Sequence, residues 1–224
     1  MDNKNWNKSI SITMLGMFTA IIFLFALTPI AFIPIAFIGS ATTLHIPVIV
    51  GSLVLGPKHG AVLGFMFGMA SVIRTTMMPV LSSFVFSPFI PVPGTDSGSP
   101  LALIVAFVPR ILVGIVPWFV FKGLMKLVAS PTTPLQFIFL AITGVVGSMT
   151  NTLLVMHLWY FLFRTPWAYA RQEPIEAMYP LVLTIIGTAG FAEAILAGVT
   201  VPLICIALFT VSKQLMPVRS VNTR

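Results

Sequence analysis

The sequence predicts an all-α integral membrane protein with six transmembrane helices and with both termini in the cytoplasm. Charged residues make up only 8% of the 224 residues, and hydrophobic residues make up 58%. A soluble domain carries about 25% charged residues. Apolar segments of roughly the 20 residues that cross a bilayer recur along the chain. We therefore expect residues 1–224 to form a single transmembrane domain.

Six apolar segments account for the expected helices. The second of them is short for a membrane span. The connections 29–44, 79–100 and 164–179 are expected on the extracellular side. The six helices are expected near residues 9–28, 44–56, 59–78, 101–124, 133–163 and 180–211.

Two of the outer connections are apolar and rich in proline. Pro29 and Pro34 interrupt the segment before the second helix. We expect a loop folded back into protein there, because irregular backbone at membrane depth is tolerated only inside protein or along a cavity. The segment 79–100 has five prolines and no helical period. Its aromatic residues argue against disorder and favour a functional loop.

The distribution of lysine and arginine predicts the orientation. With an even number of spans both termini share one side, and eight of the twelve basic residues then fall on that side. Because cytoplasmic segments carry an excess of Lys and Arg, we place both termini in the cytoplasm. Asp96, Glu173 and Glu176 fall on the opposite side. The eight basic residues are Lys4, Lys8, Lys58, Lys122, Lys126, Lys213, Arg219 and Arg224.

The sequence lacks the motifs of common enzymes and nucleotide-binding proteins. GPKHG does not continue as a Walker A loop, and neither HExxH nor GxSxG occurs. The single cysteine, Cys205, lies in an apolar run, which excludes a disulfide framework and disfavours a metal–thiolate site. The net charge of +7 is scattered between apolar runs. We expect no nucleic acid partner, no cofactor, no metal and no catalytic residues. MDNKNWNKSI precedes an apolar run without a clear cleavage site, so we expect a retained first helix.

An arginine and a glutamate lie inside predicted spans. Arg110 stands about nine residues into the fourth helix from its outer end, roughly 13 Å deep at 1.5 Å per residue, and Glu193 has a comparable depth in the sixth. Ionisable residues inside a membrane are costly and mark candidate functional sites. Three roles are open for Arg110: snorkelling to the interface, an ion pair with Glu193, or a bidentate contact with a ligand carboxylate.

Other polar residues occur in the outer and middle sections of the spans. Each has a packing alternative: Asn151 as a helix–helix hydrogen bond, His45 and His157 as buried packing residues, and Arg74 as an interface marker. Thr43 stands beside His45, and Phe86 lies in the aromatic connection 79–100. Together they predict a small outward-facing pocket with a polar base and an apolar lid. The candidate ligand-binding residues are Arg110, Asn151, Glu193, His157, Phe86, Arg74, Thr43 and His45.

Small residues at a spacing of four occur on two of the predicted helices. Gly16 and Ala20 permit close approach of another helix near the cytoplasmic end of the first helix. This contact is equally compatible with a neighbour in the same chain and with a partner subunit. Gly60, Gly64 and Gly68 form the same pattern on the third helix, where packing within the chain is favoured.

Four stretches resemble the substrate-binding S components of energy-coupling factor (ECF) vitamin transporters, and among them most closely the pantothenate-type branch. They are ATTLHIPVIVGSLVLGPKHGAVLG, SSFVFSPFIP, AFVPRILVGIV and GSMTNTLLVM. The resemblance covers nearly the whole chain. The TTLHIP and GPKHGA stretches are fairly specific to this branch, whereas PRILVG is shared more widely.

The resemblance implies a six-helix protein in the bacterial cell membrane that binds one vitamin near the extracellular side. It also implies docking on a transmembrane coupling subunit (T component) driven by two ATPase subunits, transport by toppling in the lipid bilayer, and gating by the connection between the first two helices. The family's AxxxA docking motif is represented here by Gly16 and Ala20. An Asn-Gly pair that precedes the last-helix glutamate in relatives is replaced by Ala189–Gly190, which puts the substrate specificity in doubt.

Pantothenate suits the predicted pocket best. Its carboxylate fits Arg110, its amide and hydroxyls fit Asn151 and Glu193, and its gem-dimethyl group fits the aromatic loop near Phe86. Pyridoxine and hydroxymethylpyrimidine, the alternative substrates, need no buried arginine. Two other classes stay open: a stand-alone secondary carrier and a structural membrane subunit in which Arg110 pairs with Glu193. No convincing internal repeat supports the carrier.

Overall fold

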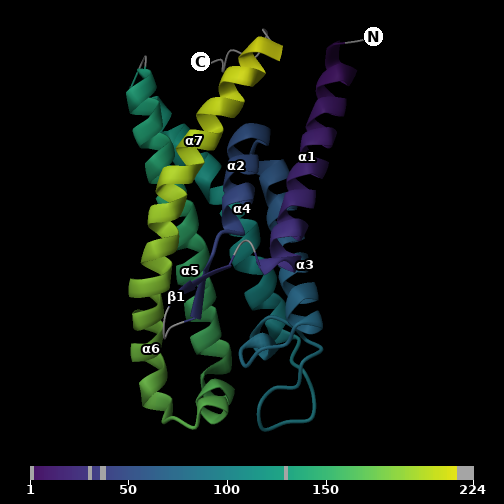
Figure 1. Cartoon of the computed structure of the whole chain (residues 1–224), viewed down its shortest axis with the longest axis vertical. Helices are drawn as coiled ribbons and strands as arrows, with labels where there is room; N and C mark the ends of the chain where they lie inside the picture. Colours follow the sequence, from purple (N-terminus) through teal and green to yellow (C-terminus); the bar gives the residue numbers. More distant parts are fainter. Residues whose placement is uncertain (1–2, 30–31, 36–38, 129–130, 216–224) are drawn as a thin grey trace.

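The computed structural model describes residues 3–29, 32–35, 39–128 and 131–215, which form an elongated helical bundle (Figure 1). Within these ranges five helices are long and apolar enough to cross a membrane, and α2 is a shorter apolar helix. The predicted all-α membrane bundle is thus confirmed. The main helices are α1 (Asn3–Leu27), α2 (His45–Leu55), α3 (Pro57–Met77), α4 (Leu101–Lys126), α5 (Thr133–Arg171), α6 (Met178–Ile185) and α7 (Phe191–Leu215).

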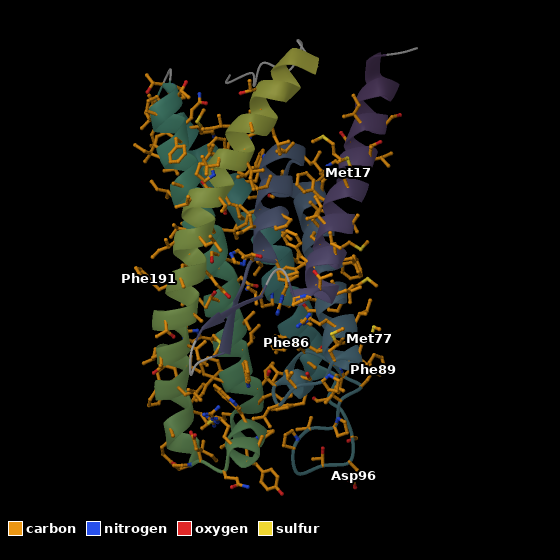
Figure 2. All side chains as sticks on the ribbon, in the orientation of Figure 1. Met17, Met77, Phe86, Phe89, Asp96 and Phe191 are labelled. Atoms are coloured by element: carbon orange, nitrogen blue, oxygen red, sulfur yellow. The ribbon has the colours of Figure 1, made fainter. Side chains whose placement is uncertain are left out.

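Successive spans run alternately up and down the bundle, with α6 and α7 forming one span (Figure 1). The beginning of α1 and the end of α7 lie at the same end of the molecule (Figure 1). Asp96, in the connection between α3 and α4, lies at the opposite end (Figure 2). This arrangement agrees with an even number of crossings, while the side of the membrane on which each end lies stays a prediction.

The connection between α1 and α2 differs from the expected loop. It contains an antiparallel hairpin of β1 (Phe32–Ile35) and β2 (Gly39–Thr42), in which Phe32 pairs with Thr42. The hairpin lies partway along the length of the bundle (Figure 1). The ladder satisfies backbone groups that a loop would leave unpaired at membrane depth. The 11 residues of α2 span only about 16 Å, which is too short to cross a bilayer. The hairpin that precedes α2 occupies part of the remaining depth.

The fifth and sixth spans are longer than the sequence predicts. α5 continues past the expected end at 163 to Arg171, where Gln172 adopts a left-handed conformation and ends the helix. Most of the expected loop 164–179 is therefore helical, and it also contains the short 3-10 helix η3 (Ile175–Ala177). The last span consists of α6, the π-helix η4 (Ile186–Gly190) and α7 in succession. α1 begins at Asn3, before the expected residue 9, and α7 ends at Leu215, after the expected residue 211.

α2 is the central element of the bundle. Its residues from His45 to Leu53 are all buried, and it packs against α1, α3, α4, α5 and α7. A short helix surrounded on every side needs a largely apolar surface all round, which explains why His45 and Ser52 are the only polar side chains of the segment. His45, at its first position, is therefore placed in the interior of the protein.

Glycines allow α3 and α4 to lie in backbone contact. A Cβ atom on Gly60 would overlap the carbonyl oxygen of Gly114, and one on Gly64 would overlap the carbonyl oxygen of Arg110. The predicted packing role of the glycines on α3 within the chain is confirmed. Because Gly64 abuts the backbone of Arg110, this contact fixes the depth and rotation of Arg110 relative to α3.

Candidate functional site

Arg110 is held inside α4 by the proline that precedes it. Pro109 has no N–H group, so the carbonyl oxygen of Val105 loses its usual helical donor. The Nη1 of Arg110 donates to this oxygen at 2.5 Å. The side chain is 7% exposed, so the guanidinium stays within the bundle and does not snorkel to a surface. Pro109 thus leaves one backbone carbonyl oxygen without its helical donor, and the next residue, Arg110, donates to that oxygen.

Two aromatic rings flank the guanidinium of Arg110. Its Cζ lies 5.3 Å from the ring centroid of Phe67 on α3 and 4.9 Å from that of Phe86, distances at which cations are attracted to ring faces. Phe86 directly follows the 3-10 helix η2 (Ser83–Val85). Figure 2 shows Phe86 between the helices and Phe89 at the edge of the bundle. The connection 79–100 therefore contributes one aromatic side chain to the site and leaves another outside.

Glu193 binds the hairpin and α5. Its Oε1 accepts the backbone N–H of Thr42 at 2.6 Å, and its Oε2 accepts the hydroxyl of Thr152 at 3.1 Å. In the described part of the chain the one ion pair within 4.0 Å joins Arg171 and Glu173. Arg110 and Glu193 are therefore not in salt-bridge contact. The carboxylate of Glu193 connects three elements, β2, α5 and α7.

Asn151 and His45 are both buried, and each lies close in sequence to a residue that binds this carboxylate. Asn151 stands next to Thr152 on α5, and His45 follows Thr42 by three residues. The Oδ1 of Asn151 and both ring nitrogens of His45 have no hydrogen-bond partner among the residues that the structure describes. Both side chains thus retain hydrogen-bonding capacity inside the protein.

The remaining candidates make contacts with other parts of the protein. The Nδ1 of His157 donates to the carbonyl oxygen of Leu153 at 2.7 Å, and the ring lies 6.4 Å from that of Tyr179. The Nη1 of Arg74 donates to the carbonyl oxygen of Ala26 at 2.6 Å, near the end of α1. The contacts of His157 fit its packing alternative, and Arg74 links α3 to α1. Thr43 is half-buried between β2 and α2. Assignment of these three residues to a ligand site stays a prediction.

Gly16 and Ala20 are exposed on α1. A Cβ atom on Gly16 would have no neighbour within 4 Å among the described residues. Ile12, Met17 and Leu24 are exposed on the same helix, and Figure 2 shows Met17 on the upper part of α1. This surface of α1 is therefore open to lipid or to a partner and is not used for packing within the described chain.

Three contributors to the site were not identified from the sequence as site residues. The first is the backbone N–H of Thr42, which no side-chain pattern can reveal. The second is the ring of Phe67, one of many phenylalanines in the chain. The third is Ser148, fully buried with an unpaired hydroxyl among the described residues. Ser148 precedes Asn151 by three residues, so helical periodicity places both on adjoining faces and is the one signal that points to it.

Comparisons with known proteins identify the family of the chain. Residues 11–205 match the family model described as ECF transporter, substrate-specific component. The pantothenic acid transporter PanT of Lactococcus lactis subsp. cremoris (strain MG1363) is 36% identical over 167 residues, which cover 75% of this chain and 76% of that protein. The apolar helices and the family together make this a multi-pass protein of the bacterial cell membrane. The chain belongs to the family of substrate-specific components of ECF transporters.

Proposed function

We propose that this protein captures pantothenate outside the cell as the substrate-binding subunit of an ATP-driven importer. The observation that carries the proposal is the buried charge of Arg110. No carboxylate of the described chain lies within 4.0 Å of this guanidinium, while Glu193 is engaged by Thr42 and Thr152. A buried ion without a counter-ion in contact costs several kcal/mol. An anionic ligand in contact with the guanidinium offsets this cost when it binds.

The chemistry of pantothenate supports the same proposal. Its carboxylate supplies the anion for Arg110, and its gem-dimethyl group is apolar, as is the ring of Phe86 beside the guanidinium. Its amide and hydroxyls require polar partners such as Asn151. Pyridoxine and hydroxymethylpyrimidine carry no carboxylate and would leave Arg110 without an anion. The similarity to a protein named as a pantothenic acid transporter adds independent support.

The partners follow from the family and from the free surface of α1. A substrate-specific component works with a transmembrane coupling subunit, and we assign the Gly16–Ala20 surface of α1 to that contact. Two ATPase subunits would drive the cycle from the cytoplasmic side. We place both termini there, which puts the connection 79–100 outside the cell. Toppling of the protein within the bilayer would then carry the ligand inward.

Binding to the purified chain tests the proposal. Calorimetry should give submicromolar affinity for pantothenate and no comparable affinity for pyridoxine or hydroxymethylpyrimidine. Tight binding of either of these two would reassign the substrate, and the absence of binding by any vitamin would favour a structural subunit. Uptake by liposomes that contain this chain without ATPase subunits would instead indicate a stand-alone carrier.

A further inference from the structure

Several buried side chains in the interior carry polar atoms that have no hydrogen-bond partner in the described chain. Burial of an unpaired polar atom is unfavourable, and such atoms are rare in folded proteins. Three of the side chains belong to helices that meet in the interior: His45 on α2, and Ser148 and Asn151 on α5. Among the described residues, the unpaired buried side-chain atoms are His45 Nδ1 and Nε2, Arg110 Nε, Ser148 Oγ, Asn151 Oδ1 and Trp159 Nε1.

The packing of α2 against α5 places His45 level with Asn151. A Cβ atom on Gly147 would lie 2.7 Å from the Cδ1 of Ile49, so these two residues face each other. The two helices run in opposite directions (Figure 1). His45 lies one turn before Ile49, and Asn151 lies one turn after Gly147. In an antiparallel pair both steps lead to the same level.

The packing of α5 against α7 gives an independent check on this level. A Cβ atom on Gly190 would lie 2.7 Å from the Cγ2 of Thr152, and Thr152 also donates to Glu193. Glu193 in turn accepts the N–H of Thr42, three residues before His45. Ser148 lies one turn from Thr152 on the same stripe of α5. The chain of contacts thus joins the beginning of α2 to the polar section of α5 without use of the α2–α5 register.

The packing of α4 against α5 places Arg110 at a different level along the bundle axis. A Cβ atom on Gly147 would lie 2.9 Å from the Cγ of Pro117, so Pro117 on α4 is level with Gly147. Arg110 precedes Pro117 by about two turns, whereas Asn151 follows Gly147 by one. Since α4 and α5 also run in opposite directions (Figure 1), Arg110 lies about one turn, roughly 5 Å along the axis, beyond Asn151. The cation and the uncharged polar groups therefore form two separate levels.

We propose that His45, Ser148 and Asn151 form a hydrogen-bonding subsite for the uncharged polar end of the substrate, while Arg110 binds its carboxylate. This inference rests on the proposed function. A neutral imidazole has one donor and one acceptor, a serine hydroxyl has both, and the Asn151 Oδ1 accepts. The three groups match the hydroxyls and the amide carbonyl of pantothenate. The inference adds Ser148 to the candidate residues and assigns His45, the first residue of α2, and Asn151 to the uncharged part of the substrate.

Calorimetry with paired ligands and variants tests the subsite. The ligands are pantothenate and its analogue in which the primary hydroxyl is replaced by hydrogen. The wild-type protein should bind the deoxy analogue about tenfold more weakly, because groups of the subsite lose their partner. Ser148→Ala, Asn151→Leu and His45→Leu should each weaken pantothenate binding. At least one should bind the two ligands with affinities that differ by less than about threefold.

Thr143→Val is the matched control. Thr143 is buried on the same helix, but its hydroxyl already donates to the carbonyl oxygen of Phe139 at 2.7 Å. This variant should keep the tenfold preference for pantothenate. A loss of preference in Thr143→Val equal to that in the subsite variants would overturn the assignment.

The outcomes separate the subsite from the proposed function. If wild-type protein binds pantothenate and the deoxy analogue equally, the subsite is wrong while the pantothenate assignment stands. This comparison needs no variant, so it remains decisive even if a substitution prevents folding. If all three variants weaken both ligands by the same factor, the residues have a structural role only. Failure of wild-type protein to bind pantothenate at all overturns both proposals.

Discussion

The carboxylate of Glu193 accepts the backbone N–H of Thr42 at 2.6 Å, so α7 holds the last residue of the β1–β2 hairpin. The other oxygen accepts the hydroxyl of Thr152 from α5. A glutamate that the sequence places in the interior therefore anchors the segment between the first two helices. It leaves the neighbouring cation, Arg110, for a ligand.

Removal of the Glu193 carboxylate should loosen the hairpin. A hydrogen bond to a charged acceptor contributes about 1.5–3 kcal/mol. Glu193→Ala should therefore speed amide exchange in the peptide that contains Thr42 by about tenfold or more, as measured by hydrogen–deuterium exchange. Glu193→Gln should retain most of the protection, because its amide oxygen can still accept this N–H. Glu173→Ala, which removes an exposed carboxylate, is the control. Unchanged protection of Thr42 in Glu193→Ala would contradict the anchoring role.

Restoring a backbone N–H at position 109 should weaken the hydrogen bond between Arg110 and Val105 without lowering the stability of the protein. In Pro109→Ala the new N–H competes with the Nη1 of Arg110 for the carbonyl oxygen of Val105. We expect pantothenate affinity to fall several-fold while the melting temperature stays the same or rises, since proline inside a helix costs about 3 kcal/mol relative to alanine. Pro202→Ala in α7, also a proline inside a helix, should leave affinity unchanged. Equal effects of the two substitutions on affinity would show that the Pro109–Arg110 pairing has no special role.

Substitution of Gly64 should separate α3 from α4 at the level of Arg110. The added methyl group overlaps the Arg110 carbonyl oxygen, and overpacking of this kind costs about 1–3 kcal/mol. Thermal unfolding of Gly64→Ala should therefore begin at a lower temperature, and the Kd for pantothenate should rise. Gly123→Ala is the control, because a Cβ atom there has open space among the described residues. A Gly64→Ala protein as stable as the control would refute the close helix contact.

A bulky residue on the free face of α1 should block transport and spare binding. Gly16→Leu or Ala20→Leu should leave calorimetric affinity within about twofold, because neither position packs on the bundle. ATP-driven uptake by the reconstituted complex should fall at least tenfold if the coupling subunit needs close approach there. Gly123→Leu places the same bulk on an exposed glycine of another helix and should transport normally. Wild-type uptake in both α1 variants would exclude this face as the docking surface.

Hydrophobicity alone predicted most of the fold. The cost of polar groups in a bilayer makes long apolar segments easy to recognise, and Lys58 and Lys122 mark helix ends. The same reasoning ended α5 too early, because Arg164 and Pro166 suggest a loop. A charged residue is tolerated in a helix near the membrane–water interface. A proline is tolerated there because neighbouring helices can satisfy the backbone groups that it leaves unpaired. The hairpin was missed because the carboxylate that holds Thr42, that of Glu193 on α7, lies far away in the sequence.

The site was predictable only in part, for a related reason. Arg110 and Glu193 were identifiable because a charge inside a membrane span has few structural uses. Ser148 was not, because serine and threonine are common in helices, where they bond to their own backbone, as Thr143 does. The register between antiparallel helices decides which hydroxyl remains unpaired. That register is set by glycines such as Gly147, and the sequence alone does not show which residues of other helices pack against them.

The central claim is that Arg110 binds the substrate carboxylate, and a cycle of two proteins and two ligands tests it most directly. Calorimetry should compare pantothenate with the analogue whose carboxylate is replaced by a primary amide, in the wild type and in Arg110→Ala. Arg164→Ala serves as control, since Arg164 is an exposed arginine that also lies over an aromatic ring, that of Tyr160. We predict that the wild type and the control prefer pantothenate by about 100-fold and that the preference disappears in Arg110→Ala. A preference that persists in folded Arg110→Ala would contradict the account.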